Sequence, residues 1–220
     1  MPVSSDQIVI YVGPSLAVQD ARQILDADYR PPIRRGDIVA LMKAPPKIIG
    51  IIDGKFFQSF AISPKEMLPG IDAGIVMLGS SSMGALRAVE LHPFGMIGVG
   101  RIFEMYHTGE IDADDEVAMV FDDETGRAHS VPMVNVRVAL ETAVKEGVIS
   151  AESERMLVKL VKDLYFPERS YAMLLKLASD KIPEQERASL RQYLQERAPD
   201  AKRDDAIQLL HEVKRLAATL

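Results

Sequence analysis

A short run of small polar residues followed by one arginine is the strongest candidate for a chemical site in this sequence. The small residues are Gly79, Ser80, Ser81 and Ser82, and Arg87 follows them. Residues 75–78 form an apolar run typical of a buried strand, and residues 83–91 are mostly good helix formers. A helix that begins just after a strand presents free N–H groups and a positive dipole end to an anion. The pattern therefore predicts a ligand site made of hydroxyl groups, N–H groups and a guanidinium.

The same turn has the outline of a nucleophile elbow, which is a small-x-Ser-x-Gly segment between strand and helix. In that interpretation Ser82 is the nucleophile and the N–H groups of the turn stabilise an oxyanion. The usual first glycine is missing, and the candidate bases His92, His107 and His129 have no diagnostic setting. A serine cluster at such a turn is more often a helix cap or an anion cradle. Arg87 either clamps the anion or pairs with Glu90, and we favour the anion role.

Two other predicted strands also end in polar or small residues. Ser15 closes a Gly-Pro-Ser segment after the strand at 7–12, and Asp53 follows the apolar run 47–52. Because ligands bind beyond the carboxyl ends of parallel strands, we expect Ser15, Asp53 and Ser82 to meet in one cleft. Asp53 is equally readable as a turn residue before glycine.

Lys65 and Glu66 occupy the first turn of a predicted helix that Ser63 and Pro64 open. The Ser-Pro pair makes this turn rigid, which suits either a ligand-binding role for both charged residues or a plain surface position.

An acidic segment spans residues 102–126, which contain no Lys or Arg. Its densest part includes Asp114, Asp115 and Glu116. Several carboxylate oxygens in residues 110–116 suit a divalent cation, which is the minority interpretation. The spacing does not match a calcium-binding loop, so we predict no metal site here. Such a run is a solvated loop or a surface for a basic partner.

Alternating apolar strands and helical segments predict an α/β fold with a mainly parallel sheet and flanking helices, a Rossmann-like three-layer arrangement. Residues 38–42 and 117–121 are expected to be further strands, with a hairpin turn at 123–126. From residue 151 onward the pattern is helical. We therefore divide the chain into an α/β core domain, residues 1–150, and a helical C-terminal extension, residues 151–220.

Composition excludes several classes of protein. The 220 residues contain no Cys, which excludes disulfides and thiolate chemistry. The net charge is −6, and residues 1–150 hold 20 Asp and Glu against 13 Lys and Arg, which argues against nucleic-acid binding. No basic leader or apolar run of membrane length occurs, so we expect a cytoplasmic protein with no membrane contact.

Nine motifs in fixed order resemble the TfuA family, whose members act beside YcaO enzymes. The residues that carry the resemblance are Val12–Leu16, Tyr29 with Pro31 and Pro32 and Arg35–Asp37, Ile51–Gly54, Lys65–Leu68, Ser82–Ala88, Phe94–Met96 with Gly98–Gly100, Tyr106 and Gly109, Asp114–Ala118, and Val134–Arg137. The chain departs from the pattern at Pro64, where the family often has His, and this removes one candidate base.

The resemblance implies an accessory protein for ATP-dependent YcaO chemistry that replaces a backbone amide oxygen with sulfur. It implies activation of the YcaO partner and help with sulfur delivery, by hydrolysis of a thiocarboxylate on a ThiS-like sulfur-carrier protein. A thiocarboxylate is an anionic acyl group, which suits a site of N–H donors with Ser82, Arg87 and Asp53. The expected partner-binding residues are Asp114, Asp115, Glu116 and Arg137. No cofactor is implied.

Two alternatives remain at this level. One is a regulatory partner of a YcaO enzyme whose strand-end loops form an interface without chemistry. The other is a phosphate- or nucleotide-binding enzyme, which lacks support because the chain has no Walker lysine and no complete dinucleotide glycine pattern.

Overall fold

The structure is a computed structural model and describes residues 3–56, 61–122 and 125–220. Its contacts divide the chain into two compact units. Unit 1 comprises Met1–Asp112 and Lys202–Leu220, and unit 2 comprises Ala113–Ala201. These units differ from the division expected at residue 150, because the last helix returns to the sheet of unit 1 while the segment before residue 150 joins the helices of unit 2.

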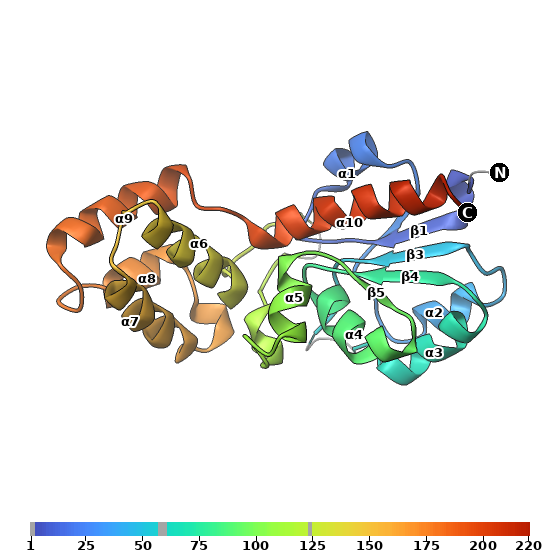
Figure 1. The fold of residues 1–220 in the computed structure, drawn as a ribbon, viewed down its shortest axis with the longest axis horizontal. Coiled ribbons are helices and arrows are strands. Elements are labelled where there is room, and N and C mark those ends of the chain that lie inside the picture. The colour runs from blue at the N-terminus through green and yellow to red at the C-terminus, as the bar shows by residue number, and fades with distance from the viewer. Residues whose placement is uncertain (1–2, 57–60, 123–124) are drawn as a thin grey trace. The chain divides into compact units, whose positions relative to one another are not determined.

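Unit 1 is built on a five-stranded parallel sheet (Figure 1). The strands are β1 (Ile8–Tyr11), β2 (Asp28–Arg30), β3 (Ile48–Ile51), β4 (Val76–Gly79) and β5 (Ile97–Gly98). Their order is β2-β1-β3-β4-β5, and every pair of neighbours is parallel. The direction of winding reverses between β1 and β3, and a doubly wound sheet binds its ligands beyond the strand ends at that position.

Helices cover both faces of this sheet, which makes the three-layer α/β fold that the sequence predicted. The helices of unit 1 are α1 (Val18–Ile24), α2 (Asp37–Leu41), α3 (Pro64–Asp72), α4 (Met83–Leu91), α5 (Arg101–His107) and α10 (Ala201–Ala217). Figure 1 shows α1 and α10 on one face and α2, α3 and α4 on the other. Buried residues of α1 and α10 share one apolar cluster with β1 and β3.

The strand expected at residues 38–42 is wrong, because this segment forms α2. Gly36 precedes the helix with a φ of 94°, and the carboxylate of Asp37 accepts a hydrogen bond from the N–H of Arg34 at 2.9 Å. Ile38 and Leu41 are buried while Val39 is 62% exposed, which is the spacing of a helix face rather than a strand. The β-branched residues of this segment misled the prediction because the local turn chemistry overrides their strand preference.

Two glycines allow α4 to lie directly against the ends of β3 and β4. A Cβ atom added at Gly84 would lie 1.8 Å from the carbonyl oxygen of Ile51, and one at Gly79 would lie 2.1 Å from that of Gly84. These obstacles are backbone atoms, which cannot move aside as a flexible side chain can. The glycines therefore hold residues 79–82, which we call the serine turn, close to the sheet.

We expect Gly84→Ala to lower the free energy of unfolding by about 3 kcal/mol, since the added methyl group forces the helix away from the sheet. Gly109→Ala is the control, because Gly109 has a φ of 77° and nothing within 4 Å of an added Cβ. That variant should cost about 1–2 kcal/mol from backbone conformation alone. Urea unfolding of both variants measures the difference, and equal losses would contradict the proposed close packing.

Unit 2 is helical. Its helices are α6 (Met133–Lys145), α7 (Ala151–Lys162), α8 (Tyr171–Leu177) and α9 (Glu184–Glu196), and they share one apolar core. Serine hydroxyls cap two of them: Ser150 accepts from the N–H of Ser153 in α7, and Ser170 accepts from that of Met173 in α8.

The strand expected at 117–121 is not formed. Phe121 makes an isolated bridge with Ala128, and the Val120 carbonyl accepts from the N–H of His129 at 2.8 Å. Asp123 and Glu124 of the expected turn lie outside the described residues.

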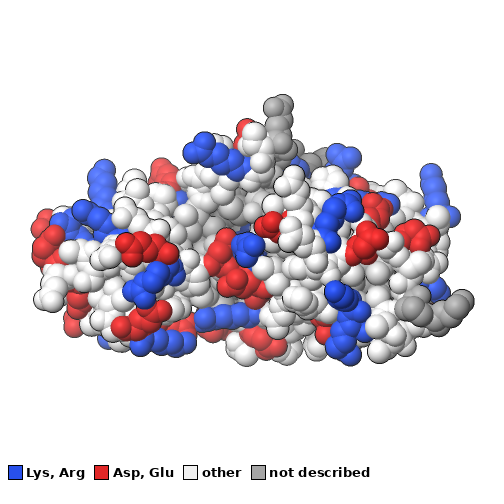
Figure 2. Space-filling view, turned by 90° about the horizontal axis from the view of Figure 1, so that it is seen from above, with Lys and Arg blue, Asp and Glu red and all other residues white. Residues whose placement is uncertain are grey.

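Within the described ranges, no helix has the length and apolarity needed to cross a membrane. On the face drawn in Figure 2, acidic and basic side chains are interspersed without a broad field of one sign.

Candidate functional site

Asp53 ties together the loops that follow β1 and β3. One carboxylate oxygen accepts from the N–H groups of Gly13 and Ser15 at 2.8 and 3.0 Å, and the other accepts from the Ser15 hydroxyl at 2.7 Å. Asp53 is 2% exposed and Ser15 5% exposed. The expected meeting of these two strand ends is therefore present, at the point where the winding of the sheet reverses.

A buried lysine connects this loop pair to the serine turn. The ammonium of Lys202, at the start of α10, donates to the hydroxyl oxygen of Ser82 at 3.0 Å and lies 3.8 Å from Asp53 Oδ1. Both the Lys202 and Asp53 side chains are only 3% exposed. Burying an unpaired ammonium is costly, and the carboxylate compensates much of that cost. Asp53, Ser82 and Lys202 thus form one cluster.

Sequence reasoning missed Lys202, although the sequence carries a signal for it. The positions of α10 that face the core repeat with helical spacing and are Lys202, Asp205, Ala206, Leu209, Leu210, Val213 and Ala217. Two charged residues therefore stand on an otherwise apolar stripe. Charged side chains are rarely fully buried unless they are paired, so such a position is a reason to look for a partner.

The serine turn leaves several polar groups without partners. Ser81 has a φ of 64°, in the left-handed region that serine rarely adopts. The hydroxyls of Ser80 and Ser81 are buried and make no hydrogen bond among the described residues. The N–H groups of Ser80, Ser82 and Gly84 donate to main-chain carbonyls, whereas those of Ser81 and Met83 have no acceptor in the part of the chain that the structure describes.

Ser82 is the N-cap residue of α4, but its side chain accepts no hydrogen bond from the helix. Its hydroxyl oxygen instead accepts from Lys202. The Ser82 hydroxyl therefore binds Lys202 instead of capping α4. The buried hydroxyls of Ser80 and Ser81, which have no partner among the described residues, lie next to the beginning of this helix. This arrangement is able to hold an anion.

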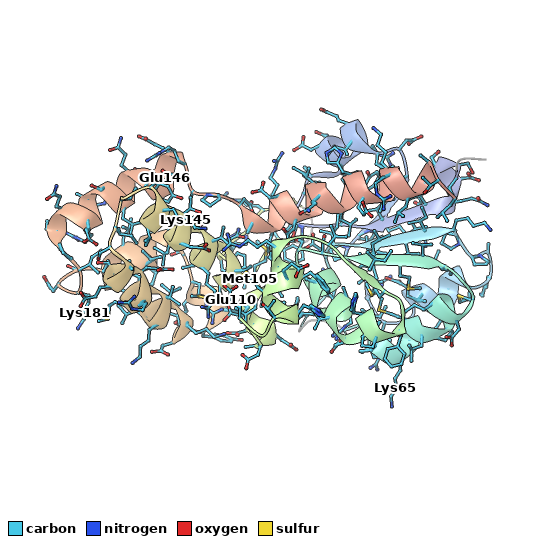
Figure 3. All side chains as sticks on the ribbon, viewed as in Figure 1. Lys65, Met105, Glu110, Lys145, Glu146 and Lys181 are labelled. Atoms are coloured by element: carbon cyan, nitrogen blue, oxygen red, sulfur yellow. The ribbon has the colours of Figure 1, made fainter. Side chains whose placement is uncertain are left out.

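The remaining residues expected near this site have other contacts. Arg87 pairs with Glu90, which was the alternative left open for it. Glu66 accepts from the N–H of Gly36 at 2.6 Å and so joins α3 to the start of α2. Lys65 is exposed, and Figure 3 shows its side chain pointing away from the ribbon. The cation that contacts Ser82 is therefore Lys202, while Arg87 pairs with Glu90.

The candidate histidines are placed elsewhere. His92 and His107 are exposed and lie against Phe103, with ring centroids 5.7 and 5.3 Å from its ring. His129 is also exposed. Across the described residues, no group of three or more His, Asp or Glu is arranged to hold a metal ion.

A family model for TfuA-like proteins matches residues 53–170, which is more than half of the chain. The chain belongs to the TfuA-like family. The TfuA-like family is known in the context of YcaO-associated modification. No curated protein shows a significant sequence match to the chain.

The TfuA-like match contains Asp53 and Ser82 but neither Ser15 nor Lys202. Two of the four side chains that meet at the strand ends therefore come from outside the matched range. The site is assembled by tertiary contacts across this TfuA-like chain, rather than by one contiguous motif.

Two of the three acidic residues in the densest part of the acidic segment, Asp115 and Glu116, lie in unit 2 of this TfuA-like chain and pair with basic residues of the same unit. Glu116 is 2% exposed, and both of its carboxylate oxygens accept from Arg137 at 2.8 Å. Lys162 bridges Asp115 and Glu116 at 2.5 and 3.0 Å. Burial alone would raise the pKa of Glu116, but the hydrogen bonds from Arg137 and Lys162 outweigh it and hold that pKa below its ordinary value.

This pairing occupies two of the four residues expected to bind a partner, Glu116 and Arg137. Buried Glu116 and its partner Arg137 are occupied with each other, because a carboxylate removed from water needs a paired cation. Asp114 is exposed and remains accessible to another molecule.

Proposed function

We propose that this protein is an accessory protein of YcaO-dependent backbone thioamidation. It releases sulfur from the thiocarboxylate of a ThiS-like sulfur-carrier protein at the cluster of Asp53, Ser82 and Lys202. The observation that carries the proposal is the ammonium of Lys202, buried 3.0 Å from the Ser82 hydroxyl at the beginning of α4. The YcaO partner is inferred from the TfuA-like family to which the chain belongs.

The charge of the site suits a thiocarboxylate. This anion resists nucleophilic attack because its negative charge is spread over the reacting carbon's oxygen and sulfur. An ammonium beside the thiocarboxylate offsets its negative charge. N–H groups that the fold already holds in place stabilise the oxyanion of a tetrahedral intermediate. The N–H groups of Ser81 and Met83 are the available donors.

Lys202 and Ser82 supply and accept the protons that move while the carbon–sulfur bond is broken. Lys202 passes a proton to the sulfur of the bound thiocarboxylate and becomes an amine, which then accepts the proton of Ser82 as its oxygen attacks the carbonyl carbon. The carbon–sulfur bond breaks, hydrosulfide leaves, and an ester with Ser82 forms. Water then hydrolyses the ester, giving the carrier carboxylate and one proton and restoring Ser82.

Ser82→Ala tests this function. We expect sulfide release from a thiocarboxylated ThiS-like carrier to fall about 100-fold, because water then attacks in place of the hydroxyl while the other donors remain. Sulfide is measured over time, and binding to the YcaO partner is measured in parallel. Ser63→Ala is the matched control, since Ser63 is also an N-cap residue without a capping hydrogen bond.

The outcomes separate the two functions. Loss of sulfide release with retained YcaO binding supports the hydrolytic site. Sulfide release at the wild-type rate in Ser82→Ala would reject Ser82 as the nucleophile. Wild-type protein that binds the YcaO partner but releases no sulfide would leave a regulatory partner without chemistry.

A further inference from the structure

The first turn of α10 is attached to unit 1 by a second buried charge besides Lys202. Asp205 is 3% exposed, and its two carboxylate oxygens accept from the N–H groups of Arg101 and Ile102 at 2.8 Å each. These N–H groups open α5 and have no acceptor within that helix. One carboxylate thus closes the beginning of α5 and links it to α10.

Gly100 makes this close approach possible. A Cβ atom at Gly100 would lie 2.3 Å from the carboxylate carbon of Asp205, and the residue has a φ of 93°. Both the space and the backbone conformation therefore require glycine. The joint is a specific fit between the Gly100 turn and the Asp205 carboxylate.

The joint constrains α10 in a way that its apolar contacts do not. The rest of the buried stripe consists of Ala and branched apolar side chains, whose contacts hold the helix on the sheet with little directional preference. Two charge-assisted hydrogen bonds from neighbouring N–H groups are directional and fix the helix along its axis. Lys202 lies three residues before Asp205, which is about 4.5 Å along the helix.

We infer that Asp205 is a positioning residue, whose carboxylate fixes the first turn of α10 on α5 and thereby holds the Lys202 ammonium against Ser82. A shift of α10 by about 1 Å would stretch the 3.0 Å contact beyond hydrogen-bond range. The consequence for sulfide release rests on the proposed function, whereas the placement of Lys202 does not.

The charges around Asp205 agree with this role. The pKa of Asp205 is raised to about 6, chiefly by burial and also by nearby Asp204, while the N–H groups of Ile102 and Arg101 and the charge of Arg101 act in the opposite direction. At pH 7.5 the group is therefore ionised, and its hydrogen bonds to the two N–H groups are charge-assisted.

The placement is tested by chemical labelling of lysines at pH 7.5, with mass spectrometry of the resulting peptides. Lys214 is the internal reference, because it lies on the same helix but is exposed. In Asp205→Ala we expect acylation of Lys202 relative to Lys214 to accelerate at least about 10-fold, since freeing a buried amine exposes it. Asp205→Asn keeps one acceptor oxygen and should give a smaller increase.

Asp204→Ala is the matched control, because Asp204 is adjacent and exposed, and it should leave the labelling ratio unchanged. Hydrogen exchange at the Arg101 and Ile102 amides should accelerate in both Asp205 variants. An unchanged Lys202 to Lys214 ratio in folded Asp205→Ala and Asp205→Asn proteins would overturn the inference.

A second measurement distinguishes positioning from a general structural role. If Asp205 acts through Lys202, Asp205→Asn lowers sulfide release in the wild-type background but not further in a Lys202→Met background. Additive losses would overturn the inference. If the labelling ratio changes while wild-type protein releases no sulfide, the positioning holds and the proposed function fails.

Discussion

Replacing Lys202 with methionine is expected to slow sulfide release from a carrier thiocarboxylate by about 1,000-fold or more. The change removes the cation that lowers the charge of the substrate and the group that moves protons between Ser82 and sulfur, and each role alone is worth about 100-fold or more. Methionine keeps the length and apolar stem of the side chain. The rate is measured with excess carrier so that weaker binding does not hide the chemical step.

The variant should still fold. Asp53 loses its cation but keeps three hydrogen bonds, from the N–H groups of Gly13 and Ser15 and from the Ser15 hydroxyl. We expect the free energy of unfolding to fall by about 1–3 kcal/mol, the cost of a buried polar group that loses one partner.

Lys214→Met is the matched control for Lys202→Met. Lys214 lies on the same helix, is exposed, and donates to the Ile24 carbonyl at 3.0 Å, away from the site. This variant should release sulfide at the wild-type rate. A folded Lys202→Met protein that retains more than a tenth of the wild-type rate would exclude Lys202 from the chemistry.

Replacing Arg169 with methionine is expected to destabilise unit 2 by about 3 kcal/mol or more, because several acceptors lose a buried donor at about 1–3 kcal/mol each. The guanidinium is 1% exposed and donates to Asp115 Oδ2 at 2.5 Å. It also donates to the main-chain carbonyls of Asp115 and Leu164 at 2.9 and 3.0 Å. Methionine fills part of the volume but satisfies none of these acceptors.

The control is Arg197→Met in the same unit. Arg197 pairs with Glu146 at 2.8 Å, but their side chains are 57% and 40% exposed. Solvent screens such a pair, so its loss should cost less than about 1 kcal/mol. Urea unfolding followed by a probe in unit 2 measures both variants, and similar losses would show that the Arg169 network contributes no more than a surface pair.

The Arg169 effect should depend on pH. Burial would raise the pKa of Asp115, but hydrogen bonds from Lys162 and Arg169 outweigh it and hold that pKa below its ordinary value. A carboxyl with a lowered pKa stabilises the folded state above its unfolded pKa, and this contribution is lost as the pH falls through the folded pKa. The stability advantage of wild type over Arg169→Met should therefore shrink on acidification.

The parts of the fold that were predictable depend on local patterns. The apolar runs indicated β1, β3 and β4. The rule that parallel strands end at one edge anticipated the contact of Ser15 with Asp53, whereas Ser82 joins them through Lys202. Residues 38–42 were misassigned because an apolar, β-branched run suits a strand or a helix. There the preceding glycine turn and the Asp37 side chain decide the outcome.

The parts that were not predictable depend on contacts across long stretches of chain. Lys202 meets Ser82 over 120 positions, and Asp205 meets Arg101 over 104. No local periodicity reports such pairings. Asp115 and Glu116 read as a free acidic surface because Arg137, Lys162 and Arg169, which neutralise them, lie 21 to 54 positions away.

The return of α10 to unit 1 has a consequence for the newly made chain. Ribosomes add residues in order, and the strands carrying Asp53 and the turn carrying Ser82 emerge long before residue 202. Unit 2 interrupts unit 1 in sequence and has its own apolar core, so it can fold while the last helix is still unmade. In a nascent chain the serine turn should therefore have no cation beside it and no activity until α10 leaves the ribosome and packs on unit 1.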